Sequence, residues 1–357
     1  IQPHAFLFFS VPALFFAPFF YKINPSKLLT FLSILLFSAS VYGLWQALNS
    51  VSRVYSFFGN PVFFGEFLSA LLPFSIAFML TAGKLRPFIL LTIMLSVFAL
   101  FFSGARVPWL SFVISSFVLF VFLKKPFLAA LRPKLDKTWL IIAVPVMIII
   151  ILLPFQFRAS FTHNLQRAVS VFSGADTAVK NRILMNKTGI EMIKEKPVLG
   201  HGPGAVKKYY QKYQSSFLSP GGSFGFINTS YIHNDYIHMS AEKGVLGLLL
   251  FTAFLIFLFK RFYTVSDRLS GSEAILAASC FSSLLGTLSA GLFNFPLHIL
   301  PSAALFWFFS GILAADRGND AVLKKSDFMA PALFAVSYTH LRAHETVLDL
   351  VCRLLLE

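Results

Sequence analysis

The stretch SYIHNDYIHMSAEKGVLGLLLF, residues 230–251, decides the fold class, because a polar segment with two histidines and an acid runs directly into an apolar helix. After Lys243, no charged residue occurs until Lys260. A helix buried inside a soluble protein does not need such a polar entrance, whereas a membrane enzyme that works at the bilayer surface does. The rest of the chain decides between these two possibilities.

Apolar runs recur along almost the whole chain. Hydrophobic residues make up 57% of the sequence, including 45 Phe, and charged residues only 13%, against about 25% in a typical soluble domain. A helix needs about 20 apolar residues to cross a bilayer. Nine runs approach this length: residues 5–21, 28–48, 62–81, 87–102, 107–123, 139–155, 245–262, 274–293 and 297–315. We therefore predict an all-α fold, a polytopic transmembrane helix bundle of nine spans, with a tenth that starts near Phe328 and is cut short.

Lys and Arg are distributed unequally between the two ends of these spans. One set of connections carries Lys22, Lys27, Lys84, Arg86, Lys124, Lys125, Arg132, Lys134, Lys137, Lys260, Arg261, Arg268, Arg317, Lys324 and Lys325. The intervening short loops hold only Arg53 and Arg106, so the positive-inside rule places the first set in the cytoplasm. The same alternation places the long hydrophilic segment, residues 156–243, outside. The net charge of +15 then mainly reflects topology and does not imply binding to nucleic acid.

The predicted spans divide the chain into three regions and a tail. Residues 1–155 hold the N-terminal transmembrane helices, residues 156–243 a large, partly helical extracytoplasmic loop, and residues 244–335 the C-terminal transmembrane helices. Since Ile1 is not Met and lies in an apolar run, we expect that the native N-terminus is missing. In the tail, VSYTHLRAHET matches a translated sequencing adapter, so residues 336–357 are excluded from fold reasoning. Cys280 then remains in a predicted span, and neither a disulfide nor a cysteine metal site is expected.

Short helices are predicted within the outer loop. The segment NRILMNKTGIEMIKEKPVLGHGPG, residues 181–204, predicts an amphipathic helix that ends at Pro197 and the glycines after it. Its predicted apolar face consists of Val179, Ile183, Ile190 and Ile193. The segment AVKKYYQKYQ, residues 205–214, predicts a second helix. We expect Asn228, Thr229 or Ser230 to cap the helix that follows.

The two histidines of the opening stretch lie five residues apart. On a helix over residues 231–243, His233 would share a face with Ile237 and Gly244, and His238 would point elsewhere. This spacing is poor for a metal pair, because zinc-binding histidines on one helix lie four apart. His233 at a water–lipid boundary suits a general base that accepts a proton from a sugar hydroxyl. A histidine that merely caps the helix end is the alternative, and the residues alone favour it.

The spacing of one histidine, one asparagine and two glycines in this stretch resembles a known family signature. HNDYIHMSAEKGVLG has His and Asn, nine residues, Gly, two residues and Gly, at His233, Asn234, Gly244 and Gly247. This pattern resembles that of the O-antigen ligase and polymerase superfamily of bacterial membrane glycosyltransferases. The upstream element with Arg182 followed by PVLGHGPG also resembles the family, as do RVYSFFGNPVFFGEFL, SGARVPWL and FNFPLH. The resemblance spans roughly residues 51–315; SGAR departs from the usual SRG-like order, which leaves the register of Arg106 open.

The resemblance implies a reaction and a place for it. A glycan would move from an undecaprenyl-diphosphate-linked donor to an acceptor hydroxyl, most simply that of lipid A-core, at the periplasmic face of a bacterial inner membrane, with membrane lipids as further partners. The implied catalytic base is His233. The implied donor-binding residues are Arg182, Arg106 and Arg53; Asn234 and Glu66 support the site, and Gly200, Gly202, Gly244 and Gly247 are structural. For Glu66, an ion pair with Arg53 at the membrane interface is an equal alternative to a role in the site.

Other functions remain open from the sequence. A chain-extending O-antigen or capsule polymerase and a protein O-oligosaccharyltransferase would use a similar donor. A transporter or flippase would predict inverted repeats and ionisable residues at mid-membrane, and neither pattern is evident. A purely structural membrane subunit would leave the ordered motifs unexplained. Because the sequence has no Asp-x-Asp motif, we expect an enzyme without metal or other cofactor that does not use nucleotide sugars.

Overall fold

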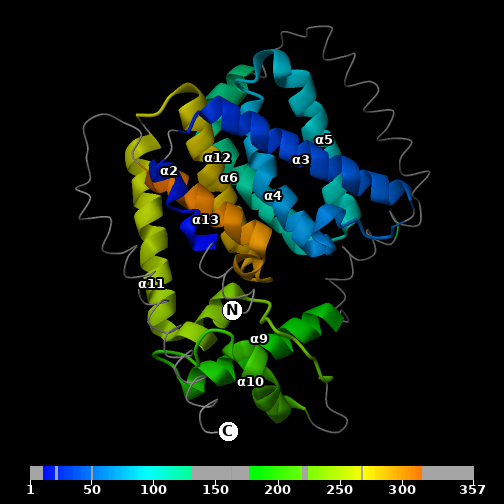
Figure 1. Cartoon of the computed structure of the whole chain (residues 1–357), viewed down its shortest axis with the longest axis vertical. Coiled ribbons are helices and arrows are strands. Elements are labelled where there is room, and N and C mark those ends of the chain that lie inside the picture. Colours follow the sequence, from blue (N-terminus) through cyan, green and yellow to red (C-terminus); the bar gives the residue numbers. More distant parts are fainter. Residues whose placement is uncertain are drawn as a thin grey trace.

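The computed structural model describes residues 11–20, 23–49, 51–130, 162, 177–218, 224–266 and 268–315. Helices are the only regular elements within these residues, which confirms the all-α prediction. They form a bundle of apolar helices and, at one end of it, a smaller layer made by α9 and α10 (Figure 1). The predicted span over residues 139–155, the truncated tenth span and the tail lie outside the described residues.

Within the described residues, six helices are long and apolar enough to cross a membrane. They are α3 (Pro25–Leu48), α4 (Pro61–Phe78), α5 (Arg86–Ser103), α6 (Arg106–Ala130), α11 (Asp235–Ser266) and α12 (Gly271–Ala290). The last predicted span is the shorter α13 (Leu300–Ala314), and within the first only α2 (Ala17–Phe20) and a turn before it are described. Single-turn helices η1 (Ser56–Phe58), η2 (Gly83–Leu85) and η5 (Pro296–His298) lie in the connections.

The starts of α3 and α4 follow from one local pattern, Asn before Pro. The Asn24 side chain accepts a hydrogen bond of 3.0 Å from the backbone N–H of Lys27, and Asn60 accepts one of 2.8 Å from that of Val62. Proline at the first helical position needs no such partner and already has the helical φ. This pattern sets the point at which each chain segment enters the bundle.

Helices α4, α6 and α12 pack against one another in the middle of the bundle, with α3 and α5 against α4 and with α13 against α12. In α4 and α12, 78% of the most apolar window is buried, against 28% in α11, which therefore lies at the bundle edge. Small and hydroxyl-bearing residues allow close helix contacts in bilayers. The Ser33 and Ser75 hydroxyls are 3.0 Å apart, and those of Ser40 and Ser96 are 2.8 Å apart.

The smaller layer made by α9 and α10, here called the outer layer, has a small core of its own. Helices α9 (Thr177–Glu195) and α10 (Ala205–Gln214) match the two predicted helices. The core comprises Met185, Met192, Val206, Tyr210, Ile232 and Ala241. The predicted apolar face of α9 is wrong, because Ile183 and Ile190 are exposed while Leu184 and Met192 are buried. Gly189 lies on the buried face: a Cβ there would lie 2.6 Å from side-chain atoms of Ile232 and Ile237, so the glycine lets the partner segment approach on this face.

Candidate functional site

Two glycine-containing segments interlock at a kink in α11. Gly244 has φ 68° and ψ −178°, which interrupts the helix and releases backbone groups on both sides of it. The freed carbonyls of Ala241 and Glu242 accept hydrogen bonds of 3.0 and 2.8 Å from the N–H groups of His201 and Gly202. The Glu242 carboxylate additionally accepts a bond of 3.3 Å from the N–H of Val206. The segment after Pro197 is therefore joined to the kink mainly by main-chain bonds, with one further bond to the Glu242 side chain.

The approach is so close that side chains are excluded at both central glycines. A Cβ at Gly244 would lie 2.0 Å from the carbonyl oxygen of Val198, and one at Gly200 would lie 2.5 Å from the backbone N of Gly244. Both have a positive φ, which L-residues rarely adopt. Gly247 makes room for the side chain of Lys243, whose Cβ lies 2.5 Å from a Cβ built there. Gly244 thus bends α11, and the absence of a side chain at Gly244 and Gly200 lets the two backbones meet.

Asn234 is the cap of α11. Its side-chain oxygen accepts hydrogen bonds of 3.0 and 3.1 Å from the N–H groups of Tyr236 and Ile237, and its side-chain N–H₂ donates to the Leu292 carbonyl at 3.1 Å. The prediction that residues 228–230 provide the cap is therefore wrong. The helix begins at Asp235, so His233 lies just before it and not on one of its faces.

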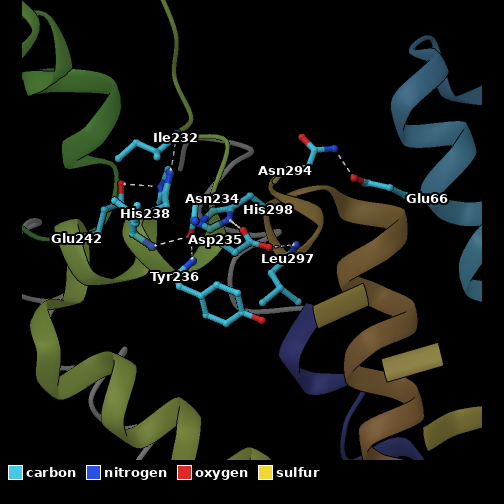
Figure 2. A network of polar contacts seen from close by, with 11 residues as sticks. Glu66, Ile232, Asn234, Asp235, Tyr236, His238, Glu242, Asn294, Leu297 and His298 are labelled. Carbon is cyan, nitrogen blue, oxygen red and sulfur yellow. Dashed lines mark hydrogen bonds and ion pairs between the residues drawn. The ribbon is translucent and has the colours of Figure 1, made fainter. Parts of the chain in front are cut away.

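Asp235 joins the start of α11 to the connection between α12 and α13. Its N–H donates to the Gly291 carbonyl at 2.8 Å. One carboxylate oxygen accepts a bond of 3.1 Å from the N–H of Leu297, and the other lies 2.7 Å from Nδ1 of His298. Figure 2 shows this fully buried acid between the start of α11 and the residues Leu297 and His298. Asp235 therefore fixes the position of η5 relative to the start of α11.

A second histidine–acid pair lies beside the first. Nε2 of His238 is 3.3 Å from the Glu242 carboxylate, and its Nδ1 accepts a bond of 3.2 Å from the N–H of Ile232. The rings of His238 and His298 have centroids 4.1 Å apart. The four side chains form one polar cluster between the kink of α11 and η5 (Figure 2). No group of three or more His, Cys, Asp or Glu residues within the described part of the chain is arranged to hold a metal ion.

His233 lies at the edge of this cluster against aromatic rings. The His233 ring meets the Phe295 ring edge to face, with centroids 4.9 Å apart. The Tyr231 ring stacks in parallel on the Phe295 ring, with centroids 4.8 Å apart. Burial and the positive charge of Arg182 lower the pKa of His233 to about 4, while a hydrogen bond with the backbone of Tyr231 opposes the shift. Its Nδ1 is buried and has no hydrogen-bond partner among the described residues. The imidazole is thus neutral near pH 7, and one of its nitrogens lacks a hydrogen-bond partner among the described residues.

The other predicted site residues lie at the same end of the bundle. Nε of Arg53 donates to the Ser103 carbonyl at 3.0 Å, which places it beside the turn where Arg106 begins α6. Glu66 is buried in α4 and accepts a hydrogen bond from the side-chain amide of Asn294, with Ser302 at 3.5 Å. The alternative in which Glu66 pairs with Arg53 is not what the structure shows. Arg182 is the arginine whose positive charge lowers the pKa of His233.

Sequence reasoning missed the polar cluster. Asp235, His238 and Glu242 lie in the quoted opening stretch, and His298 ends the quoted segment FNFPLH. The available signal was the spacing of three ionisable residues, at 235, 238 and 242. They are three and four residues apart and therefore share one face of a helix. The missing partner was 56 residues or more away, since His298 reaches Asp235 only through the fold.

Residues 89–252 match the sequence model of the O-antigen ligase family. This part of the chain is similar to the O-antigen ligase domain, and the match covers less than half of the chain. The domain includes Arg106, Arg182, His233 and both glycine segments, so the family resemblance is confirmed. It supports an enzyme of the ligase and polymerase class that acts in O-antigen processing on lipid-linked glycans in a membrane, rather than a transporter or a structural subunit. The chain matches no curated protein.

Proposed function

We propose that this protein transfers a glycan from an undecaprenyl-diphosphate-linked donor to an acceptor hydroxyl at the outer face of a bacterial inner membrane. The observation that carries the proposal is the neutral His233 beside the Arg182 charge, whose buried Nδ1 has no hydrogen-bond partner among the described residues. A buried polar atom without a partner is costly unless a ligand satisfies it. An acceptor hydroxyl that donates to Nδ1 would supply the missing partner.

His233 is the proposed base. The acceptor oxygen gives its proton to Nδ1 and forms the new bond to the anomeric carbon, while the bond from that carbon to the diphosphate oxygen breaks. The electron pair leaves with undecaprenyl diphosphate. A histidine with a pKa near 4 is a weak base, but the negative diphosphate beside Arg182 would offset the arginine's charge and raise that pKa. Donor binding would thereby strengthen the base that acts next.

Arg182 is the first proposed diphosphate ligand, with Arg106 and Arg53 as further ones. The planar guanidinium can bind two phosphate oxygens at once and stabilise charge on the leaving group. Asn234 supports the site by capping α11, and Glu66 by fixing the α12–α13 connection through Asn294. None of these roles needs a metal or other cofactor, and we propose a metal-independent enzyme.

A ligase with lipid A-core as the acceptor is the first candidate. A polymerase that extends a second lipid-linked glycan, or a protein O-oligosaccharyltransferase, is the alternative, because the same base and leaving-group site would serve each acceptor. The active site would then face the periplasm of a multi-pass protein, consistent with the polar cluster at one end of the apolar bundle.

The test is glycan transfer in proteoliposomes that contain an undecaprenyl-diphosphate-linked glycan, EDTA and either lipid A-core or a second lipid-linked glycan. We expect the wild type to transfer the glycan to lipid A-core and His233→Ala to lose at least about 100-fold of this activity. Arg182→Lys should transfer less glycan than the wild type. Lys207→Ala, an exposed cation on α10, is the matched control and should keep its activity.

The possible outcomes distinguish a ligase from a polymerase and test the roles of His233 and of metal ions. Transfer only to the second lipid-linked glycan would identify a polymerase. Unimpaired transfer by His233→Ala would return His233 to a structural role, and transfer that EDTA abolishes would overturn metal independence. A wild-type protein that transfers to neither acceptor would contradict both the ligase and the polymerase, and transfer to an added acceptor protein would then identify a protein O-oligosaccharyltransferase.

A further inference from the structure

The turn that follows α9 carries two large aliphatic side chains at the surface. Val198 is 64% exposed and Leu199 is 45% exposed. Both belong to the segment between Pro197 and Gly200 that interlocks with the kink of α11. Neither side chain belongs to the small core of the outer layer. Two adjacent aliphatic residues at the tip of a turn are unfavourable in water, so an apolar partner is expected for them.

The position of this turn is fixed with respect to α11. The carbonyl oxygen of Pro197 accepts a hydrogen bond of 2.8 Å from the N–H of Val245, and that of Val198 accepts one of 3.3 Å from the N–H of Leu246. These are the first two residues after the kink. Because a Cβ at Gly244 would clash with the Val198 carbonyl, the chain segments are in direct backbone contact. Val198 and Leu199 therefore stay beside the first turn of the apolar part of α11.

The apolar part of α11 supplies the context. Before the kink, residues such as Asp235, His238 and Glu242 are buried in the protein. After it, Val245, Leu246 and Leu249 are exposed, the last by 60%, on a helix long and apolar enough to span a bilayer. Figure 1 shows α11 along the edge of the bundle, with its lower end in the α9–α10 layer. The surface of the turn thus continues the lipid-facing surface of the helix.

Basic residues lie immediately before the turn. Lys194 and Lys196 are exposed at the end of α9, and the flexible stem of a lysine can lie along apolar surface while its ammonium reaches water or a lipid phosphate. Aliphatic residues flanked by lysines are typical of segments that lie in the interface of a bilayer. Lys194 is paired with Glu191 at 2.7 Å, whereas Lys196 lies directly before the turn. The lysines before the turn and the aliphatic pair within it therefore fit the boundary between acyl chains and headgroups.

We propose that Val198 and Leu199 are inserted into the outer edge of the lipid bilayer. The turn then acts as a membrane contact of the extracytoplasmic layer, in addition to the spanning helices. Since α9 ends in this turn and also packs on Ile232 and Ile237, the contact holds the Arg182 helix and the start of α11 at the level of the lipid headgroups. A lipid-linked diphosphate has its charge at that level.

The experiment measures the depth of the turn directly. Val198→Cys, in a background with Cys280→Ala and Cys352→Ser, is labelled with the environment-sensitive fluorophore NBD and reconstituted into phosphatidylcholine–phosphatidylglycerol vesicles. We expect blue-shifted emission, strong quenching by lipids with a spin label near the start of the acyl chain, and weak quenching by aqueous iodide. Leu249→Cys on α11 is the positive control, and Lys207→Cys on α10 is the water-exposed control.

Leu199→Cys is a second position in case one labelled variant does not fold, and it should give the same result. A Val198 label that responds like the Lys207 label, with red-shifted emission and strong iodide quenching, would overturn the proposal. A label shielded from iodide but not quenched by spin-labelled lipids would also overturn it, because it would indicate a protein partner such as a second copy of the chain. The readout needs no substrate, so it stands whether or not the proposed transfer reaction is confirmed.

Discussion

At the scale of single residues, the site is defined by a histidine that the fold keeps neutral. His233 is surrounded by aromatic rings and lies within reach of the Arg182 charge, and both effects disfavour its protonated form. A neutral imidazole is the form that can accept a proton. The same surroundings make the protein's stability depend on pH in a specific direction.

Protonation of His233 should destabilise the fold. Its pKa falls from an ordinary value of 6.5 to about 4 in the folded chain, so the unfolded chain binds more protons at this position between those values. The free energy of unfolding should therefore rise with pH from about 4 to 6.5, and this contribution is lost as the pH falls through the window. Thermal unfolding of detergent-solubilised protein from pH 4.5 to 7 should show a shallower slope for His233→Gln than for the wild type. Equal slopes would contradict the assignment.

Asp235 should act as a positioning residue. Asp235→Asn keeps the size of the side chain but removes one of the two acceptors for Leu297 N–H and His298 Nδ1. We expect η5 and Phe295, which contacts His233, to shift, and transfer to fall by about tenfold or more with little change in donor KM. Tyr236→Phe, which loses only its hydroxyl bond of 2.7 Å to Leu288, is the control. A loss no larger than that of the control would contradict this role.

At the scale of elements, the motif spacing corresponds to the two ends of one short helix. Asn234 caps the helix, and Gly244 ends its first segment with a kink whose freed backbone groups bond to the turn after α9. His233 precedes the cap. The spacing between the histidine and the first glycine therefore sets the distance between His233 and the place where α11 turns along the bundle.

Gly244→Ala should disrupt this arrangement. Alanine is strained at φ 68°, and its Cβ would lie 2.0 Å from the Val198 carbonyl oxygen. We expect a loss of about 2 kcal/mol or more in the free energy of unfolding, measured as a lower Tm in detergent. Gly225→Ala is the matched control, because no atom lies within 4 Å of a Cβ built there. Similar Tm values for the two variants would show that the kink tolerates a side chain.

At the scale of the whole molecule, one buried contact joins segments far apart in the chain. Glu66 of α4 accepts a hydrogen bond from Asn294, 228 residues later, in the connection between α12 and α13. Asp235 joins the same connection to α11. The central helices and the start of α11 are thus linked through residues 291–298, among which Phe295 contacts His233.

Asn294→Ala should weaken that link. The variant leaves the buried Glu66 with only the longer contact to Ser302, and an unsatisfied buried polar group costs about 1–3 kcal/mol. We expect a lower Tm in detergent. Ser302→Ala, which removes only the contact of 3.5 Å, should lower it less. Equal effects would mean that Asn294 does not stabilise Glu66.

Local sequence by itself determined the elements and the chemistry of this protein. Long apolar runs have no stable alternative to helices in a bilayer, so six spans, the two helices of the outer layer and the glycine segments could be predicted from neighbouring residues. The motif also singled out His233 and Arg182 as candidates. Such features depend on interactions within a few turns of chain.

Only the tertiary structure decided how these parts meet. The buried face of α9 depends on which residue allows a partner to approach, and Gly189 rather than the periodicity of isoleucines settles it. The bend at Gly244 depends on a turn more than forty residues earlier, about one-eighth of the chain away. Likewise, Asp235 meets His298 and Glu66 meets Asn294 across 63 and 228 residues. Contacts over such separations leave no periodic pattern in one sequence, because each partner's position is set by the packing of the whole bundle.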